Sequence, residues 1–155
     1  QNLPVFERGS GAASGDTLAA ASNVSRGAYV LAEAPNGSPD VILIATGSEV
    51  QIAVEARGVL AAEGINARVV PAPSLEWFEE QDAAYRESVL PASVTARVSI
   101  EAGINLTWRP YVGDRGRSVS IEHFGASADY KTLFREFGIT TEAAVAAAKD
   151  TLAAQ

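Results

Sequence analysis

Residues 41–45, with the sequence VILIA, form a short and continuous run of apolar, mostly β-branched side chains. Such a run predicts a strand that is covered on both faces. Apolar residues then recur at helical spacing, and Gly64 predicts the end of that helix. A second apolar run at 67–70 predicts another strand, and a strand–helix–strand unit makes the two strands parallel. The expected buried face of the helix comprises Ile52, Ala53, Ala56, Val59 and Leu60.

The rest of the chain predicts an α/β domain of the same kind. Residues 29–32 read as a short strand, and the turn residues at 35–39 make it run antiparallel, either beside the strand at 41–46 or elsewhere in the sheet. Ser74, Asp82 and Thr140 are expected to begin helices, because their side chains can accept hydrogen bonds from free helix amides. The other predicted elements are helices at 74–78, 82–90, 130–137 and 142–152 and strands at 96–100 and 118–121.

Length and composition limit the organisation and the partners of the chain. A chain of 155 residues has the size of one domain. We expect a linker and N-terminal loop segment over residues 1–26, because residues 9–16 are small and polar, and a single domain over 27–155. The net charge of −7 disfavours nucleic acid as a partner. With no Cys and no apolar run of membrane-spanning length, the chain is predicted to be cytoplasmic, without disulfides or membrane contact.

The segment 46–49 is the first candidate binding site, because it joins the buried strand to the helix. Free amides at a helix start favour anions, and ligands of such sheets gather at the carboxyl ends of the strands. Thr46 and Glu49, and likewise Ser48 and Gln51, have the spacing of a capping box, which would satisfy these amides from within. The negative charge of Glu49 would also repel a phosphate. We expect a capped turn; the alternative is an anion site at Thr46, Gly47, Ser48 and Glu49.

Other motifs have weaker support. Residues 9–14 approximate a dinucleotide fingerprint, but no buried strand precedes them. His123 follows Glu122 and could act as a general base, although no nucleophile motif accompanies it and a surface or interface position is expected. The acidic residues Glu76, Glu79, Glu80 and Asp82 are typical of a solvated helix face. The aromatic groups at 77–78 and 108–111 fit either docking against another domain or core packing. No catalytic, cofactor-binding or metal-binding residue is assigned.

Several longer segments of the sequence resemble the C-terminal domain of transketolase. They are GAYVL at 27–31, IATGSEV at 44–50, AAEGINARVVPAPS at 61–74, QDAAYRESVLP at 81–91, ARVSIEAG at 96–103 and FGASADYKTLFREFGIT at 124–140. The resemblance covers essentially all 155 residues, and Asp129 departs from the proline that is common after FGASA. It implies a three-layer α/β/α fold with a mixed, mostly parallel five-stranded sheet whose first strand is antiparallel.

The resemblance also implies that catalysis and cofactor binding belong to other domains of the enzyme. Transketolases of the pentose phosphate pathway transfer a two-carbon ketol unit between sugar phosphates, using thiamine diphosphate and Mg²⁺. The family holds these cofactors in its N-terminal and middle domains, across a homodimer interface, so no cofactor is expected in this domain. The leading hypothesis is a non-catalytic structural and assembly domain. The alternatives are a regulatory module that binds an anion or nucleotide at residues 46–49 and, with less support, a free-standing dinucleotide enzyme.

Overall fold

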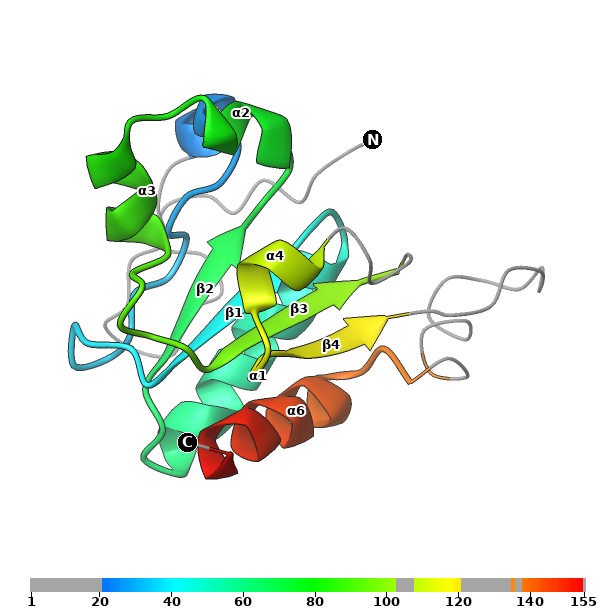
Figure 1. Ribbon diagram of the computed structural model, residues 1–155. Helices are drawn as coiled ribbons and strands as arrows, with labels where there is room; N and C mark the ends of the chain where they lie inside the picture. Colours follow the sequence, from blue (N-terminus) through cyan, green and yellow to red (C-terminus); the bar gives the residue numbers. More distant parts are fainter. Residues whose placement is uncertain (1–20, 103–107, 121–134, 136–137, 155) are drawn as a thin grey trace.

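The apolar run at 41–45 is the central strand of a parallel sheet. The computed structural model describes residues 21–102, 108–120, 135 and 138–154 (Figure 1). The strand β1 pairs with β2 on one side and β3 on the other, and Leu43 lies opposite both Val69 and Val98. All five residues of β1 are buried, as predicted for a strand covered on both faces. The sheet order is β2-β1-β3-β4, with β1 at Val41–Ala45, β2 at Ala67–Pro71, β3 at Arg97–Glu101 and β4 at Arg117–Ser120.

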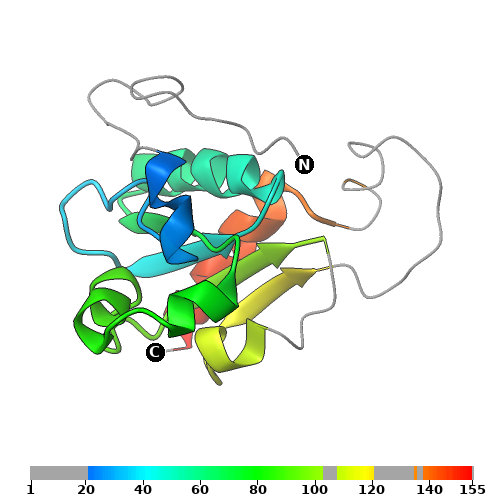
Figure 2. The ribbon, with the colours of Figure 1, turned by 90° about the horizontal axis from the view of Figure 1, so that it is seen from above.

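Helices cover both faces of the sheet, which confirms the three-layer α/β/α arrangement (Figures 1 and 2). Successive side chains of a strand point to opposite faces, so Leu43 packs toward α1 and α6, whereas Ile42 and Ile44 pack toward the other layer. Burial of one such side chain contributes roughly 1.5–3 kcal/mol. The first layer contains α1 (Glu49–Ala62) and α6 (Thr141–Ala153), and the second contains α2 (Leu75–Glu79), α3 (Ala83–Val89) and α4 (Arg109–Val112). The 3-10 helix η1 (Ala21–Arg26) contacts α2, while its Val24 packs against the core of the first layer.

The predicted first strand lies beside β2 and does run antiparallel to it, but it forms only an isolated bridge between Ala32 and Val69. The Leu31 amide donates to the Val69 carbonyl at 2.9 Å, and the Tyr29 amide donates to the Pro71 carbonyl at 3.2 Å. Pro71 has no N–H to return a bond, so the ladder stops there. The expected count of five strands is therefore wrong for the described residues, whose sheet has four parallel strands.

The predicted helix starts are confirmed at three positions. The Ser74 hydroxyl accepts from the Trp77 amide, the Asp82 carboxylate from the Tyr85 amide and the Thr140 hydroxyl from the Ala143 amide, at 3.3, 2.7 and 3.1 Å. Each of these three capping residues has the extended backbone that a helix N-cap requires. The short helix α4 was not predicted, because its four residues are too few for a periodic pattern.

One residue of the expected helical face is misplaced. Ala53, Ala56 and Leu60 are completely buried, but Val59 is 43% exposed. Adjacent residues of a helix point about 100° apart, so Val59 lies on the flank of a stripe that Leu60 occupies. The spacing of the apolar residues predicted the helix correctly, but it assigned Val59 to the buried face, which is narrower than expected.

Some predictions fall outside the described residues. These are the dinucleotide-like motif at 9–14, His123, Asp129 and most of the helix at 130–137. Of the predicted linker at 1–26, the structure describes residues 21–26, which form η1 beside α2. The domain boundary therefore stays a prediction.

Candidate functional site

The segment 46–49 lies at the carboxyl end of β1 and leads into α1, as the sequence predicted. The predicted capping box of Ser48 and Gln51 does not form, because the Ser48 side chain makes no bond to a helix amide. In the predicted box of Thr46 and Glu49, the Glu49 carboxylate binds the Ala102 amide and the Ser48 hydroxyl instead. Ser48 has a helical backbone, with φ −68° and ψ −19°, whereas a capping side chain needs an extended one. The backbone supplies the bonds instead: the Glu49 amide donates to the Thr46 carbonyl at 3.2 Å, and the Val50 amide donates to the Gly47 carbonyl at 3.4 Å.

The Glu49 carboxylate occupies the start of α1. The Glu49 residue is only 6% exposed. Its Oε1 accepts from the Ala102 amide at 3.2 Å, and its Oε2 accepts from the Ser48 hydroxyl at 3.3 Å. Burial raises the pKa of Glu49, although these bonds and one from its own amide offset part of that effect. An external anion at this helix start would meet the negative charge of a carboxylate that is already held there.

Glu101 makes the same edge of the sheet more acidic. It is the last residue of β3 and directly precedes Ala102, whose amide Glu49 holds. Burial raises the pKa of Glu101, and the neighbouring charge of Glu49 raises it further. In their ionised form the Glu49 and Glu101 carboxylates repel a phosphate, so the local electrostatics oppose an anion site at residues 46–49.

The acidic and aromatic residues that the sequence suggested as candidates lie either on the surface or in the core. The acidic residues Glu76, Glu79, Glu80 and Asp82 are all exposed. The aromatic residues differ in burial: Trp108 and Phe78 are only 2% exposed, whereas Trp77 is 50% exposed. Core packing therefore accounts for Trp108 and Phe78, and Trp77 remains a surface residue.

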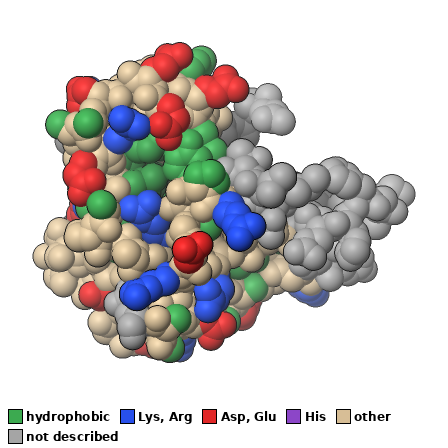
Figure 3. All heavy atoms as spheres, viewed as in Figure 1, with side chains coloured by type: hydrophobic (Ala, Val, Ile, Leu, Met, Phe, Trp, Pro, Cys, Tyr) green, Lys and Arg blue, Asp and Glu red, His purple; other side chains and the backbone are tan. Residues whose placement is uncertain are grey.

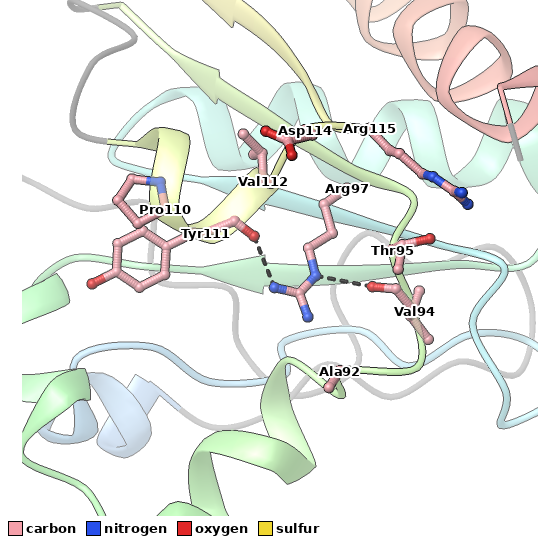
Figure 4. Close-up of a pocket in the computed structure, with 10 residues that line it drawn as sticks. Ala92, Val94, Thr95, Arg97, Pro110, Tyr111, Val112, Asp114 and Arg115 are labelled. Atoms are coloured by element: carbon pink, nitrogen blue, oxygen red, sulfur yellow. Dashed lines mark hydrogen bonds between the residues drawn. The ribbon is translucent and has the colours of Figure 1, made fainter.

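A pocket that the sequence did not predict lies at the opposite, amino-terminal edge of the sheet. Its volume is about 300 Å³, and its walls come from the segment before β3, from α4 and from the turn after α4 (Figure 4). Arg97, the first residue of β3, crosses this pocket, with Asp114 and Arg115 on its rim. The sequence contained one signal for this residue, since an arginine that begins a buried strand needs partners within the fold.

Backbone carbonyls fix the guanidinium of Arg97. Its Nε donates to the Val94 carbonyl at 3.0 Å and its Nη1 to the Tyr111 carbonyl at 2.8 Å (Figure 4). Its Nη2 donates to the carbonyls of Leu90 and Pro91 at 3.2 and 2.9 Å. Burial lowers the pKa of Arg97, and the charge of Glu87 only partly opposes this. The arginine thus joins the end of α3, the end of α4 and the start of β3.

The described part of the chain contains no group of three or more His, Cys, Asp or Glu side chains arranged for a metal ion. Within the same residues, no helix is long and apolar enough to cross a membrane.

Comparisons with known proteins agree with the fold. The family model described as "Transketolase-like TK C-terminal domain" matches residues 27–140. A transketolase of Mycobacterium bovis is 58% identical over 136 residues, which are 85% of this chain and 19% of the relative. Transketolase 1 of Escherichia coli K12 is 55% identical over 130 residues, or 84% of this chain and 20% of the relative.

A solved structure gives the same result. The transketolase from Leishmania mexicana superimposes with a TM-score of 0.79 at 35% identity, over 88% of this chain and 19% of that chain. The chain described here thus spans about a fifth of the length of these relatives. On the family match over residues 27–140, the chain belongs to the transketolase family, in which it corresponds to the C-terminal domain.

Proposed function

We propose that this chain is the C-terminal domain of an enzyme that transfers a two-carbon ketol unit between sugar phosphates. Its role within that enzyme is structural: it supports the N-terminal and middle domains and the homodimer that they form. We further propose a cytoplasmic location. The observation that carries the proposal is the match of residues 27–140 to a C-terminal domain model, within a chain that spans only 19% of its relative.

The described residues do not fit the cofactors of the whole enzyme. At the carboxyl edge of the sheet, where such folds bind ligands, both oxygens of Glu49 are already engaged by Ala102 and Ser48. Glu101 is the neighbouring carboxylate, and the pair lacks a third ligand among the described residues. Mg²⁺ needs several oxygen ligands in octahedral geometry. We therefore assign no step of the reaction, and neither thiamine diphosphate nor Mg²⁺, to this domain.

A related split enzyme supports this division. A solved structure described as "Split gene transketolase, inactive beta4 tetramer" superimposes with a TM-score of 0.63 at 25% identity, over 81% of this chain and 42% of that chain. That protein is inactive although it is longer than the chain described here. By analogy, the present chain needs the other domains for turnover.

The proposal is tested by assaying the purified 155-residue chain with thiamine diphosphate, Mg²⁺, a ketose phosphate donor and an aldose phosphate acceptor. We expect no product, while a full-length transketolase in the same assay forms product. Turnover that copurifies with the chain through several chromatographic steps would refute a purely structural role. Restored activity on mixing the chain with the missing domains would support the assembly role.

The same preparation tests the alternative of an anion site at residues 46–49. A calorimetric titration with phosphate and with nucleotides should give no saturable heat, because the Glu49 carboxylate occupies the helix start. Saturable heat that disappears in Gly47→Val would favour the regulatory module instead. A flat titration with NAD would remove the dinucleotide enzyme.

A further inference from the structure

Trp77 of α2 is a large apolar side chain that the fold leaves in solvent. Among the described residues, only Trp77 and Val59 are exposed large hydrophobic side chains, at 50% and 43%. The next residue, Phe78, is buried in the core, so α2 covers the sheet with one aromatic ring and presents the other to solvent. Burial of a Trp removes a large apolar area from water, and Trp is among the residues that most often anchor protein interfaces. The exposed indole therefore marks a candidate docking surface.

The chain joins the described fold directly beside Trp77. The helix η1 contacts α2, and Figure 1 shows the two side by side. After η1, the Gly27 carbonyl accepts from the Ser74 amide at 3.0 Å. A Cβ built at Gly27 would lie 2.9 Å from the carbonyl carbon of Trp77, so the two backbones approach closely. The residues that lead into this domain are therefore packed against the helix that carries Trp77.

Two further contacts hold this entry point in place. The Arg26 guanidinium carbon lies 4.6 Å from the centre of the Tyr85 ring, in the geometry of a cation–π interaction. The Tyr85 hydroxyl donates to the Ala28 carbonyl at 2.9 Å. Because Tyr85 belongs to α3, the segment 26–28 is joined to α2 and α3 together. A domain that precedes η1 in the chain is consequently tethered on this side of the fold, and a tether raises the effective concentration of the tethered partner.

The length of the relatives points to the partner of Trp77. The chain covers 19% of the Mycobacterium bovis transketolase and corresponds to the C-terminal domain, so in such an enzyme the other domains precede η1. Val59, the other exposed residue, lies on α1, across the sheet from α2. The position of the tether beside Trp77 favours the preceding domain over a second copy of this chain as the occupant of the surface.

The charges around Trp77 complement a basic partner. Glu76 in α2 and Glu80 at its end are exposed, and neither forms an ion pair among the described residues. Glu79, in contrast, pairs with Arg86 at 2.9 Å. Figure 3 shows acidic side chains over the upper part of the molecule, where α2 lies in Figure 1. An apolar anchor with a polar rim is the usual anatomy of a protein interface, and complementary charge on the partner gives specificity.

We propose that the preceding domain of the enzyme docks on the surface formed by Trp77, Glu76 and Glu80. The Trp77 indole fills an apolar pocket of that domain, and the two carboxylates face basic side chains at the rim of the pocket. The inference rests on the proposed position of this chain as a C-terminal domain, and it specifies which surface makes the contact.

Hydroxyl-radical footprinting compares Trp77 in the 155-residue chain with Trp77 in the full-length enzyme that contains it. We expect Trp77 to be oxidised about fivefold or more slowly in the full-length enzyme, because docking removes the indole from water. Val59 should be oxidised at similar rates in both proteins, and buried Trp108 should react slowly in both, which shows that each is folded. Equal oxidation of Trp77 in the two proteins, or equal protection of Val59 and Trp77, would overturn the proposal.

Activity separates this proposal from the proposed function. Ketol transfer by the 155-residue chain alone would refute the structural role, whatever the footprint of Trp77 shows. An active full-length enzyme in which Trp77 stays fully reactive would refute only the docking surface. Protection of Trp77 in the isolated chain that increases with its concentration would assign the surface to a second copy, and it would also overturn the proposal.

A matched pair of charge reversals tests the acidic rim. Glu80→Lys should raise the oxidation of Trp77 in the full-length enzyme by about twofold or more, because it places a positive charge opposite basic side chains. Asp150→Lys makes the same change at an exposed position in the last turn of α6 and should leave the oxidation of Trp77 unchanged. Equal protection of Trp77 in Glu80→Lys and the original enzyme would overturn the assignment of a basic rim. The comparison of the two original proteins decides the proposal even if a variant does not fold.

Discussion

Arg68 holds both oxygens of Glu33, with Nε–Oε1 and Nη2–Oε2 distances of 2.9 Å across a separation of 35 residues. The remaining nitrogen of Arg68, Nη1, donates to the carbonyls of Ser88 and Val89 at 2.9 and 3.0 Å. A single side chain of β2 thereby joins the segment before β1 to the end of α3. The paired geometry matters because a guanidinium and a carboxylate match in shape and charge.

We predict that Glu33→Gln destabilises the chain by roughly 1 kcal/mol at neutral pH, because Glu33 is partly exposed and solvent screens the pair. Burial by itself would raise the pKa of Glu33, but hydrogen bonds from Arg68 and Ala34 and the charges of Arg68 and Arg57 outweigh it and lower the pKa. The stabilisation is therefore present above the unfolded pKa and is lost as the pH falls through the lower folded value.

Urea unfolding at neutral pH and at about pH 3 measures this difference. The two proteins should converge in stability at the acidic pH. Glu76→Gln, an exposed glutamate of α2, serves as the control and should change stability little at either pH. A difference that persists unchanged at acidic pH would show that the ion pair is not its cause.

Glu49→Gln should have the opposite pH dependence. Burial raises the folded pKa of Glu49, so its contribution is fully present below the unfolded pKa and is lost as the pH rises through the folded value. Glutamine resembles the neutral carboxyl group and can still accept from the Ala102 amide. We expect the variant to gain roughly 0.5–1 kcal/mol relative to the original chain at neutral pH and to lose this advantage near pH 4.

The neighbouring carboxyl reports on the same change. The charge of Glu49 contributes to the raised pKa of Glu101, so Glu49→Gln should lower the pKa of Glu101. An NMR titration of the carboxyl carbons measures it directly. Glu49→Ala, in contrast, leaves the Ala102 amide without its acceptor and should cost about 1–3 kcal/mol. An unchanged pKa of Glu101 in Glu49→Gln would disprove the coupling.

Gly27→Ala should be severely destabilising. Gly27 has φ +81°, and a Cβ there would lie 2.2 Å from the Ser74 carbonyl oxygen and 2.4 Å from the Phe78 amide nitrogen. Since both neighbours are backbone atoms of the start of α2, they cannot move aside without disturbing that helix. We expect a loss of roughly 3 kcal/mol or more.

Gly37→Ala is the matched control, because its φ of +78° is nearly the same while no atom lies within 4 Å of the added Cβ. Only the backbone cost of about 1 kcal/mol should remain. Thermal or urea unfolding of the two variants separates close packing from backbone strain. Equal losses in both variants would mean that the contact with α2 contributes nothing.

Tyr111 should ionise at unusually high pH. Burial, the hydrogen bond to Glu79 and the charge of Glu79 raise its pKa to about 12, and the charge of Arg86 only partly opposes them. Stability that depends on the neutral phenol is fully present below the unfolded pKa and declines as the pH rises toward the folded one. In Glu79→Gln the pKa of Tyr111 should fall, whereas Glu80→Gln, which changes an exposed neighbour, should leave it unchanged. NMR of the tyrosine ζ carbons follows the titration, and a value near 10 in the original chain would contradict the assigned contact.

Predictions based on residues that are close in sequence were the most successful. The apolar run at 41–45 became the central strand, and Ser74, Asp82 and Thr140 cap their helices as expected. The capping pattern of Ser48 and Gln51 failed because the helical backbone of Ser48 keeps its side chain from a helix amide. A residue pattern identifies which groups can bond, and the backbone of the folded chain selects those that do.

The sequence by itself determined the α/β class, the positions of most elements and the family. Apolar periodicity, helix caps and long segments that resemble the family are all local properties of the chain. Tertiary structure decided the partners of the charged groups: Arg68 with Glu33, Glu49 with Ala102, and Arg97 with four carbonyls. It also reduced the predicted fifth strand to a bridge, since the missing N–H of Pro71 matters only once residues 29–32 lie beside β2. Partners that are 35 or 53 residues apart become neighbours only through the packing of the sheet and its helices, so no local pattern in the sequence identifies them.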